Sequence, residues 1–461
     1  MEGTEFNFSY EPGVTQEQII GFEMAGEIWS QYLTDNVTIN IHVDITDQLP
    51  ENVIGGALPG MKKDVKYEKL WREMLEDIST LDDLTAFNNA ASGKEFTALV
   101  NGQAVNKLEK MKVTNANSKA LDIINGDSDK LDGYIVMSDL TGQSNVQWDY
   151  DFLRDSEIAD SSLDFVSVAL HEVGHVLGFV SGVDDGDWFN VVTKANEDGK
   201  EIKGGDMKFV SPLDLFRYSG RGQMDLSMGT DAYFSIDGGQ TNLANFSTGE
   251  STTMGGDGFQ ASHWKQSDNN ALGIMDPVLK LGQQREISSL DTTAMDVMGW
   301  DVVNPGELNW QELYDNALDN ADDATIENGE KEVEKMIQDS ETYKGSRSSR
   351  SRRSRRNQIA LWQNIKFQTL DLSTVEIEPA LAFSETLMVV DYFVDAKTYE
   401  AVASNNSQDL VEVVSPSLKI TETTTSILET QSTSTNELES LDLSQLGQLI
   451  GKGVESYGSL I

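Results

Sequence analysis

Apolar residues recur with the periods of regular secondary structure in the first part of the chain. Residues 16–34 place apolar side chains three or four positions apart, which predicts a helix with one buried side. That side carries Ile19, Phe22, Ala25 and Trp29. Residues 37–45 instead alternate apolar and polar side chains, and a period of two predicts a strand. We expect its apolar members to face the core: Val37, Ile39, Ile41 and Val43.

The same kinds of pattern continue toward a helix that contains two histidines. Residues 65–90 have a mainly helical pattern, and residues 132–140 predict another strand. A Ser161-x-x-Asp164 capping pattern then precedes an apolar run that begins at Phe165, and this combination predicts a helix. Helix, strand, helix, strand and helix in this order indicate an α+β domain, in which helices pack on a mixed, twisted sheet.

The composition changes about two thirds of the way along the chain, and this change predicts the end of the first domain. Residues 1–305 have the mixed pattern of a folded domain. Residues 306–358 are first acidic and helix-forming and then rich in Arg and Ser, and residues 359–461 are acidic and rich in Ser and Thr. We expect a partly disordered extension from residue 306 onward. The arginine block within it, residues 347–356, is interpreted as a solvated linker, an anion-binding patch or a processing site.

Charge and composition exclude several classes of function. The 461 residues carry a formal net charge of −43. A surface this acidic repels nucleic acid and anionic membranes, so neither is an expected partner. The chain has no run of 18 apolar residues, and we therefore expect no transmembrane segment. The absence of cysteine excludes disulfides, thiolate metal ligands and cysteine nucleophiles.

Candidate chemistry lies in the apolar helix, within the sequence HEVGH. His171 and His175 are four residues apart, so both imidazoles project from one helix face and can share a Zn²⁺ ion. Glu172 lies about 100° around the helix from His171, where it can reach a water on the metal without being a ligand. A helix with two solvent-facing polar residues is the simpler interpretation, but burying uncoordinated rings in so apolar a helix is costly. We expect the chain to turn away from the helix at Gly178.

A catalytic zinc site needs a third protein ligand. In the compact pattern HExxHxxGxxH this ligand would fall at Ser181, and serine is a poor zinc ligand. Two other histidines remain. His42 belongs to the polar side of the strand predicted at residues 37–45, so we expect a surface role or a sheet contact for it. His263 is then the candidate for the third ligand.

Several motifs occur in the order typical of one protein family. They are HExxHxxG, then His263-Trp264-Lys265, then Ile274-Met275-Asp276-Pro277, and then a Ser-x-Leu-Asp helix that ends at Met298-Gly299-Trp300. Over about residues 10–302 the chain resembles the leishmanolysin-like group of the metzincin zinc proteases. In that group an insertion after the glycine displaces the third histidine, as residues 179–262 would do here. Leishmanolysin itself is rich in disulfides, whereas this chain has no cysteine.

The resemblance implies a metzincin-like zinc metalloendopeptidase that cleaves polypeptides. His171, His175 and His263 would hold Zn²⁺, Glu172 would be the general base, and Met275 would be the Met-turn residue beneath the metal. The resemblance also favours a place outside the cell or on its surface, although the N-terminal residues lack the basic and apolar regions of a signal peptide. We expect a monomer.

Two alternatives remain open from the sequence. The first concerns function: the chain is a non-catalytic surface or binding protein that retains a structural zinc site. The second concerns a further cofactor, because the acidic loops 125–133 and 184–187 are candidates for Ca²⁺. Ordinary turns rich in Asp and Gly also explain these two loops.

Overall fold

The computed structural model describes residues 3–47, 49, 53–141, 146–265, 271–341 and 387–389. Its main sheet has five strands in the order β16-β1-β2-β8-β3. These strands are β1 (Glu5–Tyr10), β2 (Thr38–Thr46), β3 (Gly55–Pro59), β8 (Gly133–Ser138) and β16 (Thr325–Ile326). Neighbouring strands are parallel except at the edge, where β3 runs antiparallel to β8. The fold is therefore α+β with a mixed sheet, as the order of elements predicted.

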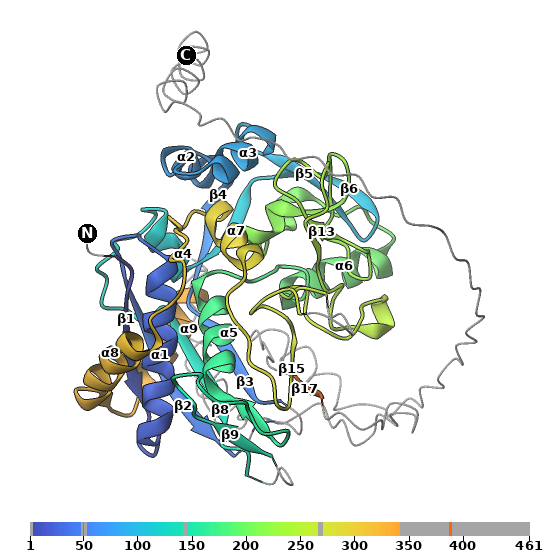
Figure 1. Ribbon diagram of the computed structural model, residues 1–461. Helices are drawn as coiled ribbons and strands as arrows, with labels where there is room; N and C mark the ends of the chain where they lie inside the picture. Colours follow the sequence, from blue (N-terminus) through green and yellow to red (C-terminus); the bar gives the residue numbers. More distant parts are fainter. Residues whose placement is uncertain are drawn as a thin grey trace, which may run out of the picture. The chain divides into compact units, whose positions relative to one another are not determined.

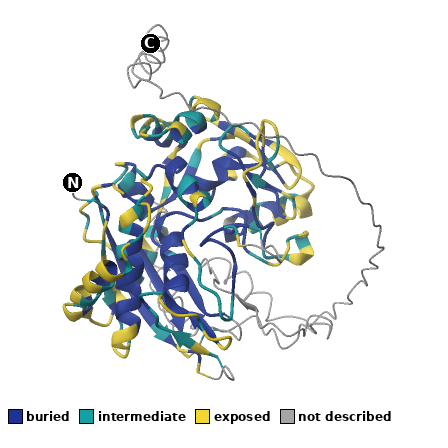
Figure 2. Cartoon of the chain, viewed as in Figure 1, coloured by how far each residue is buried: buried dark blue, intermediate teal, exposed yellow. Residues whose placement is uncertain are grey.

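Two long helices cover one face of this sheet (Figure 1). They are α1 (Gln16–Tyr32) and α5 (Phe165–Leu177), and they pack against each other and against the sheet. The Thr15 side chain accepts a hydrogen bond from the Gln18 amide, and the Gln18 side chain accepts one from the Thr15 amide. This capping box fixes the start of α1. Buried residues concentrate in the sheet and in α5, which places the histidine helix inside the core (Figure 2).

The other face of the sheet is covered by a helix from beyond residue 305. Helix α9 (Glu330–Glu341) buries Val333 and Met336 against Tyr134 and Val136 of β8. The polar side of β2 is also buried rather than exposed, and Gly329, just before α9, lies against the His42 ring. His42 is only 1% exposed, stacks on Tyr134 and contacts the Ser9 hydroxyl through Nδ1 at 2.8 Å. Of the two roles expected for His42, the structure therefore shows the sheet contact.

Residues 310–341 belong to the folded core, which differs from the extension expected from residue 306. Helix α8 (Trp310–Asp322) packs on α1 through the buried residues Leu313, Ala317 and Ala321, and β16 pairs with β1. The three buried residues recur every four positions, which gives α8 one apolar side. Most of its other positions are polar, so the overall composition is acidic and does not indicate a buried helix. The arginine block lies outside the described residues, as does most of segment 359–461.

Shorter elements surround the two main layers. The small sheets pair β4 (Met61–Lys66) with β7 (Lys110–Thr114), β5 (Phe96–Val100) with β6 (Gln103–Leu108), β9 (Gln147–Asp149) with β10 (Ser162–Asp164), and β15 (Val278–Lys280) with β17 (Leu387–Val389). A four-stranded sheet contains β11 (Arg217–Gly220), β12 (Gln223–Met224), β13 (Tyr233–Phe234) and β14 (Ala244–Asn245).

The remaining helices lie between these strands in the sequence. They are α2 (Tyr67–Glu76), α3 (Leu81–Asn89), α4 (Asn115–Ala120), α6 (Gly186–Asp198), α7 (Ser289–Val297) and the short 3₁₀ helices η1 (Gly204–Asp206), η2 (Leu213–Phe216) and η3 (Thr252–Met254). The helical pattern of residues 65–90 thus corresponds to two helices, α2 and α3. Within the described part of the chain, no helix combines the length and the apolarity needed to cross a membrane.

Candidate metal centre

Helix α5 carries two of the histidines and is buried along its whole length. It begins at Asp164, whose carboxylate accepts a hydrogen bond from the Ser167 amide at 3.0 Å. The cap expected at Ser161 is wrong, because residues 162–164 stay extended as strand β10 beside β9. The helix ends at Gly178, whose φ of 136° is readily adopted only by glycine. The turn thus lies where the sequence placed it.

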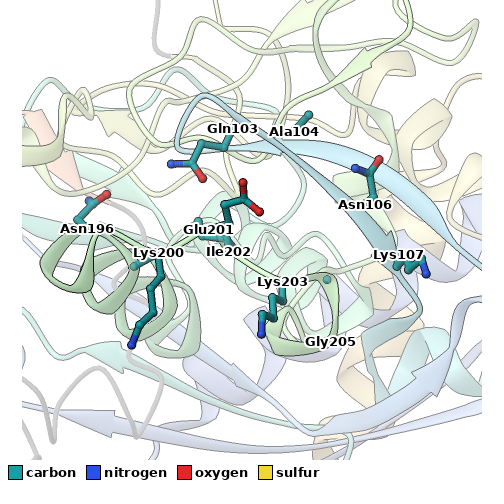
Figure 3. Close-up of a pocket in the computed structure, with 13 residues that line it drawn as sticks. Gln103, Ala104, Asn106, Lys107, Asn196, Lys200, Glu201, Ile202, Lys203 and Gly205 are labelled. Atoms are coloured by element: carbon teal, nitrogen blue, oxygen red, sulfur yellow. The ribbon is translucent and has the colours of Figure 1, made fainter.

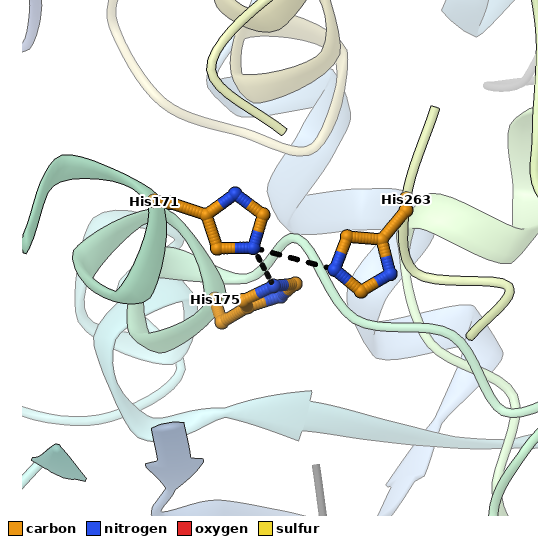
Figure 4. Close-up of side chains that lie close together, drawn as sticks. All are labelled: His171, His175 and His263. Carbon is orange, nitrogen blue, oxygen red and sulfur yellow. Dashed lines mark hydrogen bonds between the residues drawn. The ribbon is translucent and has the colours of Figure 1, made fainter. Parts of the chain in front are cut away.

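The structure brings three histidines together at the C-terminal half of α5 (Figure 4). His171 and His175 lie on the same helix face, with their Nε2 atoms 3.0 Å apart. His263 enters from the far end of the long insertion and places its Nε2 3.3 Å from that of His171. Each of the three side chains is only 1% exposed. Residues separated by 92 positions therefore form one buried cluster.

A backbone carbonyl oxygen lies against Nδ1 of each ring. The distances are 2.7 Å from His171 to Ile274, 2.6 Å from His175 to Phe179 and 3.1 Å from His263 to Gln260. A carbonyl oxygen can only accept, so each Nδ1 carries the hydrogen and donates. In a neutral ring this leaves a lone pair on Nε2. The three lone pairs therefore converge on one another.

This donor set fits a metal ion. Two zinc–nitrogen bonds of about 2.0–2.1 Å at a tetrahedral angle place their nitrogens about 3.3 Å apart. The observed separations of 3.0 and 3.3 Å are close to that spacing. The ligand atoms of all three rings lie within 4.8 Å of one another. The described chain can thus hold a metal ion through three imidazole nitrogens.

Glu172 follows His171 directly and is fully buried on α5. Successive residues of a helix are rotated by about 100°, so its carboxylate begins to one side of the histidine face. The group of side chains that could hold a metal ion here consists of the three histidines and does not include Glu172.

Met275 packs beneath the middle of the HEVGH sequence. A Cβ atom added at Gly174 would lie only 2.5 Å from the Met275 Sδ, and the Met275 side chain is fully buried. Gly174 stands between the two helical histidines in the sequence, so the methionine contacts the helix at the level of these histidines. The Met-turn role that the resemblance implies for Met275 stays a prediction.

Buried charges hold the segment that carries His263. The Arg217 guanidinium is 1% exposed and donates to the carbonyl oxygens of Ser247 at 3.0 Å and Ala261 at 3.4 Å. The Ser247 amide in turn donates to the carbonyl oxygen of His263 at 2.9 Å. The Asp184 carboxylate accepts a hydrogen bond from the Ala261 amide. Two charged side chains of the insertion therefore fix the segment that leads to His263. Arg217 and Asp184 act through Ala261, and Arg217 also acts through Ser247.

Protein donors already bind several carboxylates of the loops that the sequence proposed for calcium. Asp184 accepts from two backbone amides, and Asp185 forms an ion pair with the buried Lys112. Asp132 forms an ion pair with the buried Lys119 at 2.6 Å. These three side chains therefore have structural roles in the fold.

A second group of acidic residues gathers away from the histidines. Asp35, Asp77 and Asp301 place one carboxylate oxygen each within 4.8 Å of the others. Burial, followed by the nearby charge of Asp301, raises the pKa of Asp35 to about 7 and the pKa of Asp77 to about 8. These two carboxyl groups therefore retain protons at a pH where an exposed aspartate is ionised.

A polar pocket of about 1000 Å³ lies between β6, the end of α6 and η1 (Figure 3). Its lining includes Lys107, Lys200, Glu201 and Lys203, and it contains none of the three clustered histidines. The pocket is therefore separate from the candidate metal centre.

Sequence reasoning missed two side chains that support the histidines. Trp29 was expected only as a core residue, but its indole nitrogen donates to the Leu170 carbonyl oxygen of α5 at 3.0 Å. The Ser288-x-x-Asp291 capping pattern in the sequence predicts that Asp291 lies at the start of a helix. This pattern gives no sign of a second role for the carboxylate. The structure shows that this carboxylate also binds the segments around His263 and Met275.

Comparison with known proteins identified no similar protein. No protein-family model, curated protein or solved structure matches this chain. The geometry of the three histidines, with the glutamate between two of them in the sequence, therefore carries the functional argument.

Proposed function

We propose that this protein is a zinc-dependent endopeptidase of the metzincin type, within the leishmanolysin-like group. The observation that carries the proposal is the convergence of three Nε2 atoms from His171, His175 and His263. A glutamate next to the first ligand supports it, because a hydrolytic zinc site needs a base near the metal. Three neutral imidazoles also suit other transition metals, so the choice of zinc rests on the HExxH sequence.

In this proposal the histidines, Glu172 and three backbone carbonyl oxygens have different roles in peptide hydrolysis. Zinc held at the three histidines would supply a Lewis acid that polarises the scissile carbonyl and makes a water more acidic. Glu172 accepts a proton from the attacking water and then donates it to the departing amine nitrogen. The carbonyl oxygens of Ile274, Phe179 and Gln260 keep the Nδ1 proton on each ring, so each Nε2 would be available to a bound metal ion.

The same proposal includes the fold family, the substrate and the location. The metzincin assignment is supported by Met275 packing against Gly174 within the histidine motif. The substrates are polypeptides, and nucleic acid is disfavoured by the net charge of −43. A place outside the cell or on its surface follows from the leishmanolysin-like resemblance.

The competing function is a binding protein that keeps a structural zinc ion. Such a protein would bind zinc without turnover, and a structural site has no use for a general base. The buried Glu172 beside the ligands favours the peptidase.

Metal removal and replacement test the proposal. We expect the purified full-length chain to contain about one zinc ion and to cleave unfolded casein. Treatment with 1,10-phenanthroline should abolish cleavage, and added Zn²⁺ should restore it. The isomer 1,7-phenanthroline, which does not chelate, is the matched control. Cleavage that survives complete zinc removal would refute the proposed chemistry.

A further inference from the structure

One buried carboxylate connects the two loops that complete the metal centre. Asp291 lies at the start of α7 and is fully buried. Its two oxygens accept hydrogen bonds from Trp264 Nε1 at 2.7 Å, the Ile274 amide at 2.8 Å, the Met275 amide at 3.4 Å, and the Ser288 amide and hydroxyl, each at 2.7 Å. A capping residue needs only the contacts to Ser288. The other three bonds join Asp291 to two separate loops that precede it in the chain.

Those three bonds end next to the groups that hold the histidines. Trp264 follows His263 directly in the chain. Ile274 provides the carbonyl oxygen that accepts from His171 Nδ1 at 2.7 Å. Met275 provides the sulfur that packs against Gly174. Through one side chain, Asp291 therefore fixes the loop of the third ligand relative to the loop that orients the first.

The local packing leaves the carboxylate little freedom. A Cβ atom added at Gly273 would lie 2.1 Å from Asp291 Oδ2, so a glycine permits this close approach. The Trp264 amide also donates to the Met275 carbonyl oxygen at 3.1 Å, which joins the two loops directly. A small displacement of the Asp291 carboxylate would therefore move the Trp264 loop and the Ile274–Met275 loop together.

We propose that Asp291 is a positioning residue of the metal centre, which sets the separation between His263 and His171 and thereby the affinity for the metal. The inference rests on the proposed metal centre but not on peptidase activity. Groups that orient metal ligands typically affect metal affinity by about 10- to 100-fold.

Asp291→Asn in the full-length chain tests this role. The amide keeps one acceptor oxygen but turns an NH₂ group toward either the indole or the Ile274 and Ser288 amides, all of which are donors. The matched control is Asp296→Asn on the same helix. Asp296 is also buried, at 2% exposed, but its side chain accepts from Thr80 at 2.6 Å instead of from the histidine loops.

Three measurements separate positioning from simple stability. Zinc affinity is measured by competition with a chromophoric chelator, the ligand field by the visible spectrum of the Co²⁺-loaded chain, and stability by thermal unfolding of the metal-free chain. We expect Asp291→Asn to weaken zinc binding by about 10- to 100-fold and to change the Co²⁺ spectrum. We expect Asp296→Asn to leave the affinity within about threefold and the spectrum unchanged.

The opposite result is a metal-free Asp291→Asn chain that melts earlier but binds zinc with wild-type affinity and shows the wild-type Co²⁺ spectrum. That result would overturn the proposal and leave a structural role only. If the variant does not fold, Trp264→Phe removes a single donor and keeps an aromatic ring in place. It should weaken zinc binding by about threefold to tenfold, and unchanged affinity would equally overturn the proposal. A wild-type chain that binds zinc without cleaving casein would reject the peptidase but not this role.

Discussion

The His171 imidazole donates a hydrogen bond from Nδ1 to the carbonyl oxygen of Ile274 at 2.7 Å, across 103 positions of the sequence. Ile274 precedes Met275, whose sulfur packs against Gly174 one turn along the same helix. The loop thus contacts the histidine helix twice, once to orient a ring and once to support the backbone between two ligands. The geometry of the candidate metal centre therefore depends on the distance between this loop and α5.

Gly174 and Met275 should be coupled in stability. Gly174→Ala places a Cβ atom 2.5 Å from the Met275 sulfur, and such overpacking costs about 1–3 kcal/mol. Met275→Ala removes a fully buried side chain and should cost about 2–5 kcal/mol. The double variant should cost clearly less than the sum, because the smaller residue makes room for the added methyl group. Urea unfolding of the metal-free chain measures all three values.

Gly205→Ala is the matched control for this cycle, because no atom lies within 4 Å of the added Cβ. We expect it to change stability by less than about 0.5 kcal/mol. If the costs of Gly174→Ala and Met275→Ala are strictly additive in the double variant, the two positions have no energetic coupling, and this would contradict the prediction.

His263 should contribute to metal binding, whereas His42 should contribute only to folding. His263→Ala removes one of three ligands, so we expect zinc affinity to fall by more than about 100-fold and casein cleavage to be lost. His42→Ala removes a ring that is 1% exposed and stacked on Tyr134, so it should lower the melting temperature while zinc affinity stays the same. Zinc titration and thermal unfolding of both variants check this, and tight zinc binding by His263→Ala would exclude it as a ligand.

The acidic group around Asp77 should make stability decrease as the pH rises. Burial raises the pKa of Asp77 to about 8 in the folded chain, whereas an exposed aspartate has a pKa of about 3.9. The folded state therefore binds this proton more tightly than the unfolded state. The contribution of this carboxyl group to the free energy of unfolding is fully present below about pH 4. It is lost progressively as the pH rises toward 8. Asp35, whose pKa is about 7, adds to this loss of stability between about pH 4 and pH 7.

Asp77→Asn should remove part of this pH dependence. We expect the variant to match the wild type near pH 4 and to melt about 2–4 °C higher, or more, at pH 8. Thermal unfolding of both chains across this range is the measurement. Asp339→Asn is a suitable control, because that carboxylate is about half exposed and forms a surface ion pair with Lys130. A difference between Asp77→Asn and wild type that does not change with pH would contradict the assignment.

Local sequence signals predicted the elements whose residues interact within a few positions. Apolar periodicity predicted α1 and β2 to within two residues, and the placement of α5 and Gly178 followed from its apolar run and terminal glycine. The two helical histidines share a face because helix geometry requires it. Such features need no knowledge of distant contacts.

Features that depend on distant contacts were missed or misjudged. The polar side of β2 is buried although its alternation predicts exposure, and Gly329, almost 300 positions away, lies against the His42 ring. The acidic composition around Leu313 suggested an extension, although its few apolar residues suffice to pack on α1. Asp291 displayed a capping signal, but its bonds to Trp264 and Ile274 exist only in the folded chain.

Replacement of the proposed base tests the central claim most directly. Glu172→Gln preserves the size of the side chain but removes its ability to accept a proton, and the three histidines remain. We predict equal zinc content in wild type and variant, with casein cleavage by the variant lowered by about 10²- to 10⁴-fold. Cleavage by the variant at the wild-type rate would contradict the mechanism. Equal zinc content with no cleavage by either chain would instead favour a zinc-containing binding protein.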